Sequence, residues 1–336
     1  MDKIYAPVKI TTLHRYEHFK RCIESLKKCT SADKTEIFIG IDYPLRDEHW
    51  PGYRKILNYV DTIDGFKAIH IYIREHNYGL LNNSRDLINH IAERFDRYIA
   101  TEDDNEFSPN FLEYMNEGLE KYKDDNRVLM ICGYNYMFAD KELQSYKYNV
   151  YPFRGMMAWG YGNWMSKAKA KRSFVDQSRI NEYLHDRKLI SVMFKHNQHI
   201  TIHRLLFRYG QQSSGDLMNR IYIITNDMFC ILPKKSKVRN WGFDGSGSNC
   251  ISDANNDFEK QEIDQEKFFK YDNVEIRDYP ETISLYNKVF GRNWVLRKYI
   301  ELEYFIFLYF GINIAQKGSI VPALRKRLHL FKRGTI

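Results

Sequence analysis

The chain has 336 residues, enough for one large domain or for one domain with an appendage. Hydrophobic residues make up 43% and charged residues 28%, which excludes an intrinsically disordered protein. The formal net charge is +8, and residues 297–336 carry most of it, with eight Lys or Arg and two Glu. Because the rest is nearly balanced, the charge argues against a general nucleic-acid-binding protein and favours a local anionic partner for 297–336.

The five cysteines are odd in number and include no C-x-x-C pair, which excludes a disulfide framework and a cysteine zinc site. A reducing compartment fits this usage best. The N-terminus lacks the apolar region of a signal peptide, and no apolar run approaches the roughly 20 residues of a membrane-spanning helix. We therefore expect a cytoplasmic protein, with peripheral attachment to the cytoplasmic membrane as a further expectation.

The first half of the chain alternates β-rich runs with segments of helical spacing. Expected strands are Val8–Leu13, Glu36–Ile41, Ala68–Ile73, Arg97–Ala100 and Val128–Ile131, and expected helices are Tyr16–Cys29, Leu81–Phe95 and Pro109–Tyr122, the last with Ser108 as N-cap. This alternation predicts an α/β fold with a mostly parallel sheet covered on both faces. Ligands bind beyond the carboxyl ends of such strands. From about residue 140 the pattern loosens, and we expect a half built from loops.

The acidic cluster Glu102-Asp103-Asp104 directly follows one of these strands. Adjacent carboxylates repel each other unless a cation or a donor network compensates. Mg²⁺ and Mn²⁺ prefer such hard oxygen ligands, and the departing diphosphate of a nucleotide-sugar needs the same neutralisation. The alternative is a solvated acidic loop at the start of a helix.

The segment from Arg74 to Arg85 again leaves a strand and opens a helix. Its Asn77-Tyr78-Gly79 turn exposes backbone N–H groups at a helix N-terminus, where an anion is favoured, and Arg74 or Arg85 could add charge-assisted bonds to phosphate. The alternative is an ordinary strand-to-helix loop in which Asn and Gly supply positive φ.

Three later segments are further candidates. Trp159-Gly160-Tyr161-Gly162-Asn163-Trp164 makes a poor strand or helix and suits a sugar or a base, or else a packed turn. Asp216 stands at the start of a predicted helix, where a carboxylate could accept a proton from an attacking hydroxyl or could simply favour the helix N-terminus. The Gly- and Ser-rich run 240–250 suits a mobile loop over phosphates or a surface linker.

In order and spacing these segments resemble bacterial family-two-type glycosyltransferases of the glycosyltransferase A fold. The resemblance covers about Ala6 to Cys250 and is greatest to the branch related to the eukaryotic transferase that adds N-acetylglucosamine to the N-glycan core. The matching elements are Ala6 to Arg15, Asn77 to Leu80, Glu102 to Asp104 with Ser108 to Phe111, Trp159 to Trp164, and Asn240 to Phe243. The chain departs from relatives at Asn249, often a His, and at Asn163, an acid in some.

The resemblance implies a metal-dependent transferase that moves a hexose or N-acetylhexosamine from a nucleotide-diphosphate donor, expected to be a UDP-sugar. Asp104 would be the principal ligand of Mn²⁺ or Mg²⁺, and Asp216 the general base, which would invert the anomeric centre. The remaining donor-binding candidates are Thr12, Arg15, Asp42, Asn77, Gly79, Arg85, Glu102, Asp103, Trp159 and Gly160. The acceptor would be a glycan or lipid-linked glycan of bacterial surface polysaccharide or lipopolysaccharide synthesis.

The expected organisation is a nucleotide-sugar-binding half (1–135), an acceptor-binding and catalytic half of the same domain (136–255), and a helical, basic extension (256–336). Tyr299–Phe331 has the composition of a helix at an anionic membrane surface, or of a helix docked on the catalytic domain with its basic face in water. Two other function classes are weaker. A nucleotidyltransferase would need a Gly-rich basic loop after the first strand, which Thr12 to Glu17 lacks, and a non-catalytic membrane-associated module would not need the acidic cluster.

Overall fold

The computed structural model describes residues 4–174, 179–210, 215–247 and 257–316. The chain forms two compact units, each of which is made of two segments. Unit 1 contains Met1–Lys169 and Phe229–Arg277, and unit 2 contains Ala170–Met228 and Asp278–Ile336. These boundaries differ from the expected divisions after residues 135 and 255.

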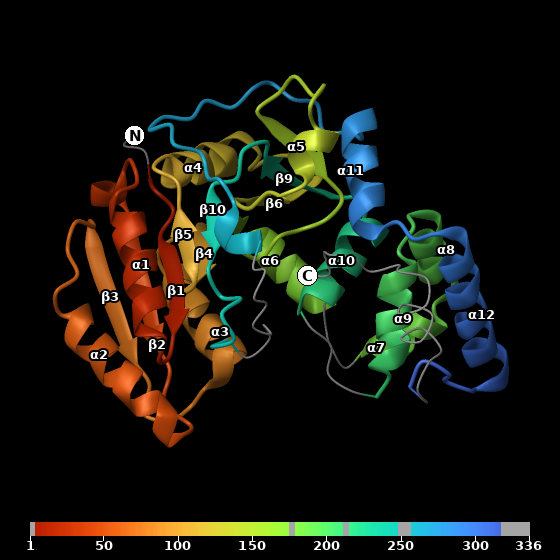
Figure 1. Cartoon of the computed structure of the whole chain (residues 1–336), viewed down its shortest axis with the longest axis horizontal. Coiled ribbons are helices and arrows are strands. Elements are labelled where there is room, and N and C mark those ends of the chain that lie inside the picture. Colours follow the sequence, from red (N-terminus) through yellow and green to blue (C-terminus); the bar gives the residue numbers. More distant parts are fainter. Residues whose placement is uncertain (1–3, 175–178, 211–214, 248–256, 317–336) are drawn as a thin grey trace. The chain divides into compact units, whose positions relative to one another are not determined.

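Unit 1 is built on an eight-stranded sheet with the order β3-β2-β1-β4-β8-β6-β9-β7 (Figure 1). Six of these strands run in the same direction, and β8 and β7 run against them. The strands are β1 (Val8–Thr12), β2 (Glu36–Ile41), β3 (Ala68–Ile73), β4 (Arg97–Glu102), β6 (Val128–Cys132), β7 (Val150–Phe153), β8 (Tyr161–Trp164) and β9 (Phe229–Pro233). The expected α/β fold with a mostly parallel central sheet is therefore confirmed.

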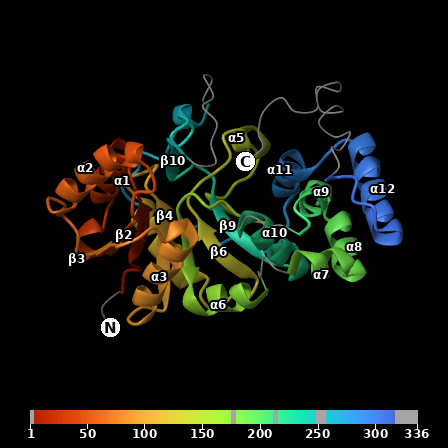
Figure 2. The same cartoon turned by 90° about the horizontal axis from the view of Figure 1, so that it is seen from below.

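Helices cover both faces of this sheet. Figure 2 shows α1 (Tyr16–Lys27) and α2 (Trp50–Val60) on one face and α3 (Gly79–Ala92) on the other. One buried cluster joins α3 and the start of α6 to the strands, and its members are Phe38, Leu87, Ile88, Ile91, Tyr98, Ala100 and Ala168. The remaining helices that begin in unit 1 are α4 (Phe111–Lys121), α5 (Ala139–Glu142) and α6 (Met165–Phe174), with 3₁₀ turns at Ala32–Lys34, Asp47–His49 and Asp257–Lys260.

Three local expectations were wrong. Helix α4 begins at Phe111 with Asn110 as N-cap, and Ser108 instead donates its hydroxyl hydrogen bond to Asn110 Oδ1 at 3.0 Å. The Trp–Gly segment contains β8, an internal strand, because Gly162 leaves room for Leu119 of α4, 3.0 Å from where a Cβ would stand. The region after residue 140 is not mainly loop, since helices occupy much of 165–225.

A second, two-stranded sheet pairs β5 (Asn105–Phe107) antiparallel with β10 (Val238–Asn240). The residue before β10, Lys237, is buried, and its ammonium group bonds to Asp264 and lies 4.2 Å from the ring centroid of Phe269. Asp264 also accepts a hydrogen bond from Asn110 Nδ2 at 3.0 Å. This ion pair ties β10, and with it the loop that follows, to the body of unit 1.

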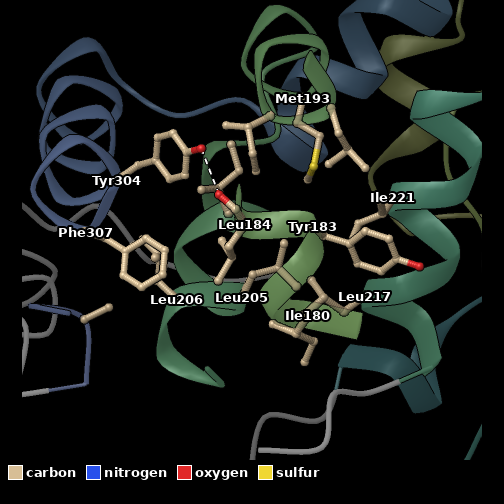
Figure 3. Close-up of a cluster of buried hydrophobic side chains, with 14 of the residues drawn as sticks. Ile180, Tyr183, Leu184, Met193, Leu205, Leu206, Leu217, Ile221, Tyr304 and Phe307 are labelled. Carbon is tan, nitrogen blue, oxygen red and sulfur yellow. Dashed lines mark hydrogen bonds between the residues drawn. The ribbon is translucent and has the colours of Figure 1, made fainter. Parts of the chain in front are cut away.

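Unit 2 is helical in the part that the structure describes. Its helices are α7 (Ile180–His185), α8 (Arg187–Lys195), α9 (His199–Phe207), α10 (Gly215–Thr225), α11 (Pro280–Phe290) and α12 (Trp294–Phe310), together with the end of α6. Figure 3 shows how apolar side chains from α7 to α10 and from α12 meet in one core, in which Tyr304 donates to Leu184 O at 2.9 Å. The buried Glu303 of α12 pairs with His203 of α9 at 2.7 Å.

Two further observations concern the class of protein. Among the described residues, no helix is both long and apolar enough to cross a bilayer. Cys22, Cys29, Cys132 and Cys230 are buried free thiols, and all belong to unit 1.

The Lys237–Asp264 pair yields a test of the core of unit 1. Lys237→Met would leave a buried carboxylate without its cation, so we expect a loss of about 3–5 kcal/mol in unfolding free energy. Lys123→Met is the matched control, because the Lys123–Glu120 pair is exposed and its loss should change the unfolding free energy far less. Thermal and urea unfolding of the full chain would measure both. Equal midpoints for the two variants would contradict the assigned role.

Candidate active site

Two carboxylates meet at the carboxyl end of an internal parallel strand. Strand β4 ends at Glu102 and β5 begins at Asn105, so Asp103 and Asp104 form the connection between two sheets. Both side chains are buried, with 3% and 7% of their residue surface exposed. Such a pair requires positive charge or hydrogen-bond donors close by.

Arg15, Thr12 and Asn240 supply these donors. Thr12, the last residue of β1, donates to Asp103 Oδ2 at 2.8 Å. The Arg15 guanidinium bonds to Asp103 Oδ1 and lies 3.0 Å from Asp104 Oδ2. Asn240 Nδ2, from β10, donates to Asp104 Oδ1 at 2.9 Å. All four carboxylate oxygens therefore have a partner, and the structure brings together four of the predicted residues: Thr12, Arg15, Asp103 and Asp104.

Glu102 lies beside this pair with a strongly altered proton affinity. Desolvation, with added repulsion from Asp104, raises the pKa of Glu102 to about 7. Burial lowers the pKa of Lys9 in the neighbouring strand to about 8, although attraction to Glu102 opposes the change. Lys9 Nζ donates to Ser84 Oγ at 2.8 Å. Lys9 was not among the predicted residues, although a lysine inside an apolar strand was a signal.

The loop after β10 approaches Asp104 through its backbone. Trp241 N donates to Asp104 O at 2.8 Å, and Gly242 N donates to Asn240 Oδ1 at 2.9 Å. A Cβ at Gly242 would stand 2.3 Å from Asp104 Oδ2. Only glycine therefore permits this close approach of the loop to the carboxylate.

Side chains of α1 hold the same loop. His18 Nε2 lies 2.9 Å from Asp244 Oδ2, and the Arg21 guanidinium lies 4.2 Å from the ring of Trp241. Although desolvation opposes it, hydrogen bonds from Ser246 and His18 lower the pKa of Asp244 to about 2. The loop was predicted as a mobile phosphate-covering segment, but these anchors could not be found from the sequence. Asn249 and Cys250, at its end, lie outside the described residues.

The end of β2 forms a second cluster of predicted residues. The buried Asp42 accepts hydrogen bonds through Oδ1 from the backbone N–H groups of Tyr43 and Tyr78, at 2.9 and 2.8 Å. Asn77 Nδ2 donates to Tyr43 O at 2.7 Å, and Gly79 at φ +71° begins α3. This carboxylate therefore fixes the turn that joins β3 to α3.

The two arginines of the β3–α3 region differ. Arg74 is buried and used within the fold, with Nε donating to Asn83 Oδ1 at 3.0 Å and a terminal nitrogen 2.7 Å from Asp86. Arg85 is exposed on α3. Of the two arginines predicted as phosphate ligands, Arg74 is already bonded to Asn83 and Asp86 within the protein.

Trp159 and Gly160 lie under the loop after β10. The Trp159 ring makes edge contacts with Tyr134 and with Phe243 of the loop, at centroid distances of 4.6 and 5.7 Å. Gly160, at φ +65°, accepts a hydrogen bond from Gly133 N at 2.7 Å. The motif thus joins β8 to an aromatic group beneath the loop.

Asp216, the predicted general base, belongs to unit 2. It stands in the first turn of α10 with its residue surface exposed. Desolvation by the surrounding protein raises the pKa of its carboxyl group, against the attraction of Arg220 and Lys171. Ser213 and Ser214, in the same predicted motif, lie outside the described residues.

The chain was compared with known proteins. No protein-family model and no curated protein sequence matches it. Among solved structures it is similar to a mannosyltransferase, PcManGT from Pyrobaculum calidifontis in complex with GDP-Man and Mn²⁺, with 11% identity, a TM-score of 0.35, and coverage of 49% of this chain and 46% of that one. It is also similar to the WbbM bifunctional glycosyltransferase, with 10% identity, a TM-score of 0.32, and coverage of 52% of this chain and 34% of that one. A third similar structure is that of S. aureus TarS, with 10% identity, a TM-score of 0.28, and coverage of 39% of this chain and 22% of that one.

The chain spans less than half the length of each of these proteins. At these identities and TM-scores the similarities carry no argument about activity. The fold assignment rests on the sheet order and strand directions, and the function must be argued from the side chains.

The raised pKa of Glu102 predicts a pH dependence of stability. The folded pKa of about 7 lies above the unfolded value of 4.5, so the folded state holds the extra proton and loses stability as pH rises between these values. We expect Glu102→Gln to match the wild type near pH 4 and to gain melting temperature relative to it near pH 7.5. The exposed Glu48→Gln is the control. A difference that stays constant between the two pH values would contradict the assignment.

Proposed function

We propose that the chain is a glycosyltransferase of the glycosyltransferase A fold that transfers a sugar from a nucleotide-diphosphate donor, a UDP-sugar in the first instance, to an acceptor hydroxyl. The observation that carries the proposal is the buried Asp103–Asp104 pair at the carboxyl end of β4. Ligands of mostly parallel sheets bind at this edge, and a diphosphate there needs neutralisation.

Asp104 is the proposed ligand of Mn²⁺ or Mg²⁺. Within the described residues no three His, Cys, Asp or Glu side chains form a metal-binding group. One or two carboxylates are nevertheless enough for Mg²⁺ when substrate phosphates and water complete its shell. The hard carboxylate oxygens of Asp104, at the edge of the sheet where ligands bind, are the donor type that such an ion prefers. When bound, the cation would offset the negative charge that develops on the leaving diphosphate.

Arg15 is the internal cation of the same group. Its guanidinium neutralises Asp103 and Asp104. We propose that Arg15 turns to the donor phosphates when the donor binds, because guanidinium groups bind phosphate oxygens as readily as carboxylates. Glu102, Asp103 and Thr12 would then orient the donor.

The other predicted donor contacts follow from the same edge. Asp42 with Asn77 and Gly79 would receive the nucleoside, and Trp159 with Gly160 the sugar. Arg85, exposed on α3, remains a proposed phosphate contact.

Asp216 is the proposed general base, which would take the proton from the acceptor hydroxyl and give an inverted product. Its place in the first turn of α10, on the exposed surface, supports this role, since the carboxylate is open to an acceptor hydroxyl. We further propose that the acceptor is a glycan or lipid-linked glycan of bacterial surface polysaccharide. The buried free cysteines fit the reducing cytoplasm as the place of reaction.

Nucleotide and metal binding test the donor site directly. We expect UDP with Mn²⁺ to raise the melting temperature of the wild type, because about 100-fold ligand over its Kd adds about 2.7 kcal/mol. Asp104→Ala should lose the shift, and the exposed Asp33→Ala should keep it. GDP with Mn²⁺ is a parallel arm. A chain that neither diphosphate stabilises would be a binding module of another kind.

Turnover tests the base. In a screen of nucleotide sugars for hydrolysis or transfer, Asp216→Asn should lower kcat by about 10²–10⁴-fold and leave the UDP–Mn²⁺ thermal shift intact. Asp33→Asn should keep full turnover. Near-normal kcat in Asp216→Asn would assign the base to another residue without affecting the donor site.

A further inference from the structure

Helix α12 has apolar side chains on two opposite faces. One face, formed by Leu296, Ile300, Tyr304 and Phe307, is buried within unit 2. The other carries large side chains that are about half or more exposed. They are Trp294 (70%), Val295 (50%), Leu302 (55%), Phe305 (49%) and Tyr309 (56%).

The exposed side chains form one continuous strip. At about 100° per residue, Trp294, Val295, Lys298, Leu302, Phe305 and Tyr309 fall within an arc of about 100°, over roughly 22 Å of helix. We call this strip the outer face of α12. Single exposed apolar residues are normal on a protein surface, but a contiguous aromatic strip of this length indicates an interaction surface.

Described cations lie on and beside the outer face. Lys298 is the one charged residue of the strip and pairs with Glu301 at 2.6 Å. The Arg187 guanidinium lies 5.4 Å from the ring of Tyr309. In the sequence that follows α12, residues 317–336 include six Lys or Arg and no Asp or Glu. That segment lies outside the described residues.

We propose that the outer face of α12 docks on the surface of an anionic lipid bilayer. Trp and Tyr favour the boundary between lipid and water, and an apolar helix face lies in that plane when cations flank it. Basic residues beside the face attract anionic headgroups. A second copy of the chain is a poorer occupant, because each copy carries six Lys or Arg and no Asp or Glu in residues 317–336, and like charges repel.

Helix α12 is a smaller membrane-contacting segment than the one expected from the sequence. Membrane contact was expected for Tyr299–Phe331, with docking on the protein as the alternative. Helix α12 does both in this proposal, since its inner face packs in unit 2 and its outer face meets lipid. The inference does not depend on the proposed transferase activity.

Vesicle co-sedimentation of the full chain tests the proposal. We expect the wild type to partition at least roughly tenfold better to phosphatidylcholine vesicles containing 30% phosphatidylglycerol than to phosphatidylcholine alone, and less at high salt. Phe305→Ser combined with Tyr309→Ser should reduce partitioning about tenfold or more. Phe268→Ser in unit 1, where 72% of the residue is exposed, is the matched control and should bind as the wild type does.

A second variant and a second measurement separate the occupants. Reversing Arg325, Lys326 and Arg327 to Glu should weaken binding to the anionic vesicles. Light scattering after size exclusion should give the same mass for the wild type and the outer-face variant. Equal partitioning of these two proteins, or no preference for anionic vesicles, would overturn the proposal. A wild-type dimer that the outer-face variant dissociates would assign the face to a second copy instead.

Discussion

Burial of two adjacent carboxylates is the constraint around which unit 1 is arranged. Asp103 and Asp104 lie where β4 leaves the sheet, and their mutual repulsion must be balanced within the protein. Arg15 comes from the start of α1, and Asn240 comes from a strand 136 residues further along the chain. The carboxylates thereby bring together the first helix, the central strand and the second sheet.

The same constraint explains why the loop after β10 is well placed. Asn240 also donates to Asn105 Oδ1 at 3.0 Å, so one amide group bonds both to Asp104 and to the residue that follows it. Lys237, three residues earlier, fixes the other end of the strand through Asp264. A loop anchored in this way brings the backbone of Gly242 against Asp104, a contact that a larger residue would prevent.

The parallel half of the sheet could be predicted because its strands read as short, β-rich and mostly apolar runs that alternate with segments of helical spacing. Glu36–Ile41 and Ala68–Ile73 were predicted with the bounds that the structure gives. The prediction for Trp159–Trp164 was wrong because its glycines allow close packing against α4, which no local pattern reveals. The sequence also could not predict that residues 170–228 and 278–336 form one unit. That grouping depends on contacts such as the one between Glu303 and His203, which are 100 residues apart.

The candidate active site could also be predicted only in part. The sequence selected Asp103, Asp104, Thr12 and Arg15 because polar residues at strand ends are local signals. It could not show that Arg15 binds both carboxylates, or that His18 holds Asp244, because these pairs form only when distant segments meet. Arg74 was a plausible phosphate ligand from its position alone, and only its bond to Asp86 shows it to be occupied.

The placement of the cysteines makes the two units distinguishable by chemistry. All five lie in the segments of unit 1, and unit 2 contains none. Burial raises the pKa of Cys29 to about 12 and that of Cys22 well above its ordinary value, so these thiols resist alkylation while the unit is closed. With Cys250 replaced by serine, the rate of thiol labelling would therefore report the opening of the sheet-containing unit alone, whatever the helical unit does.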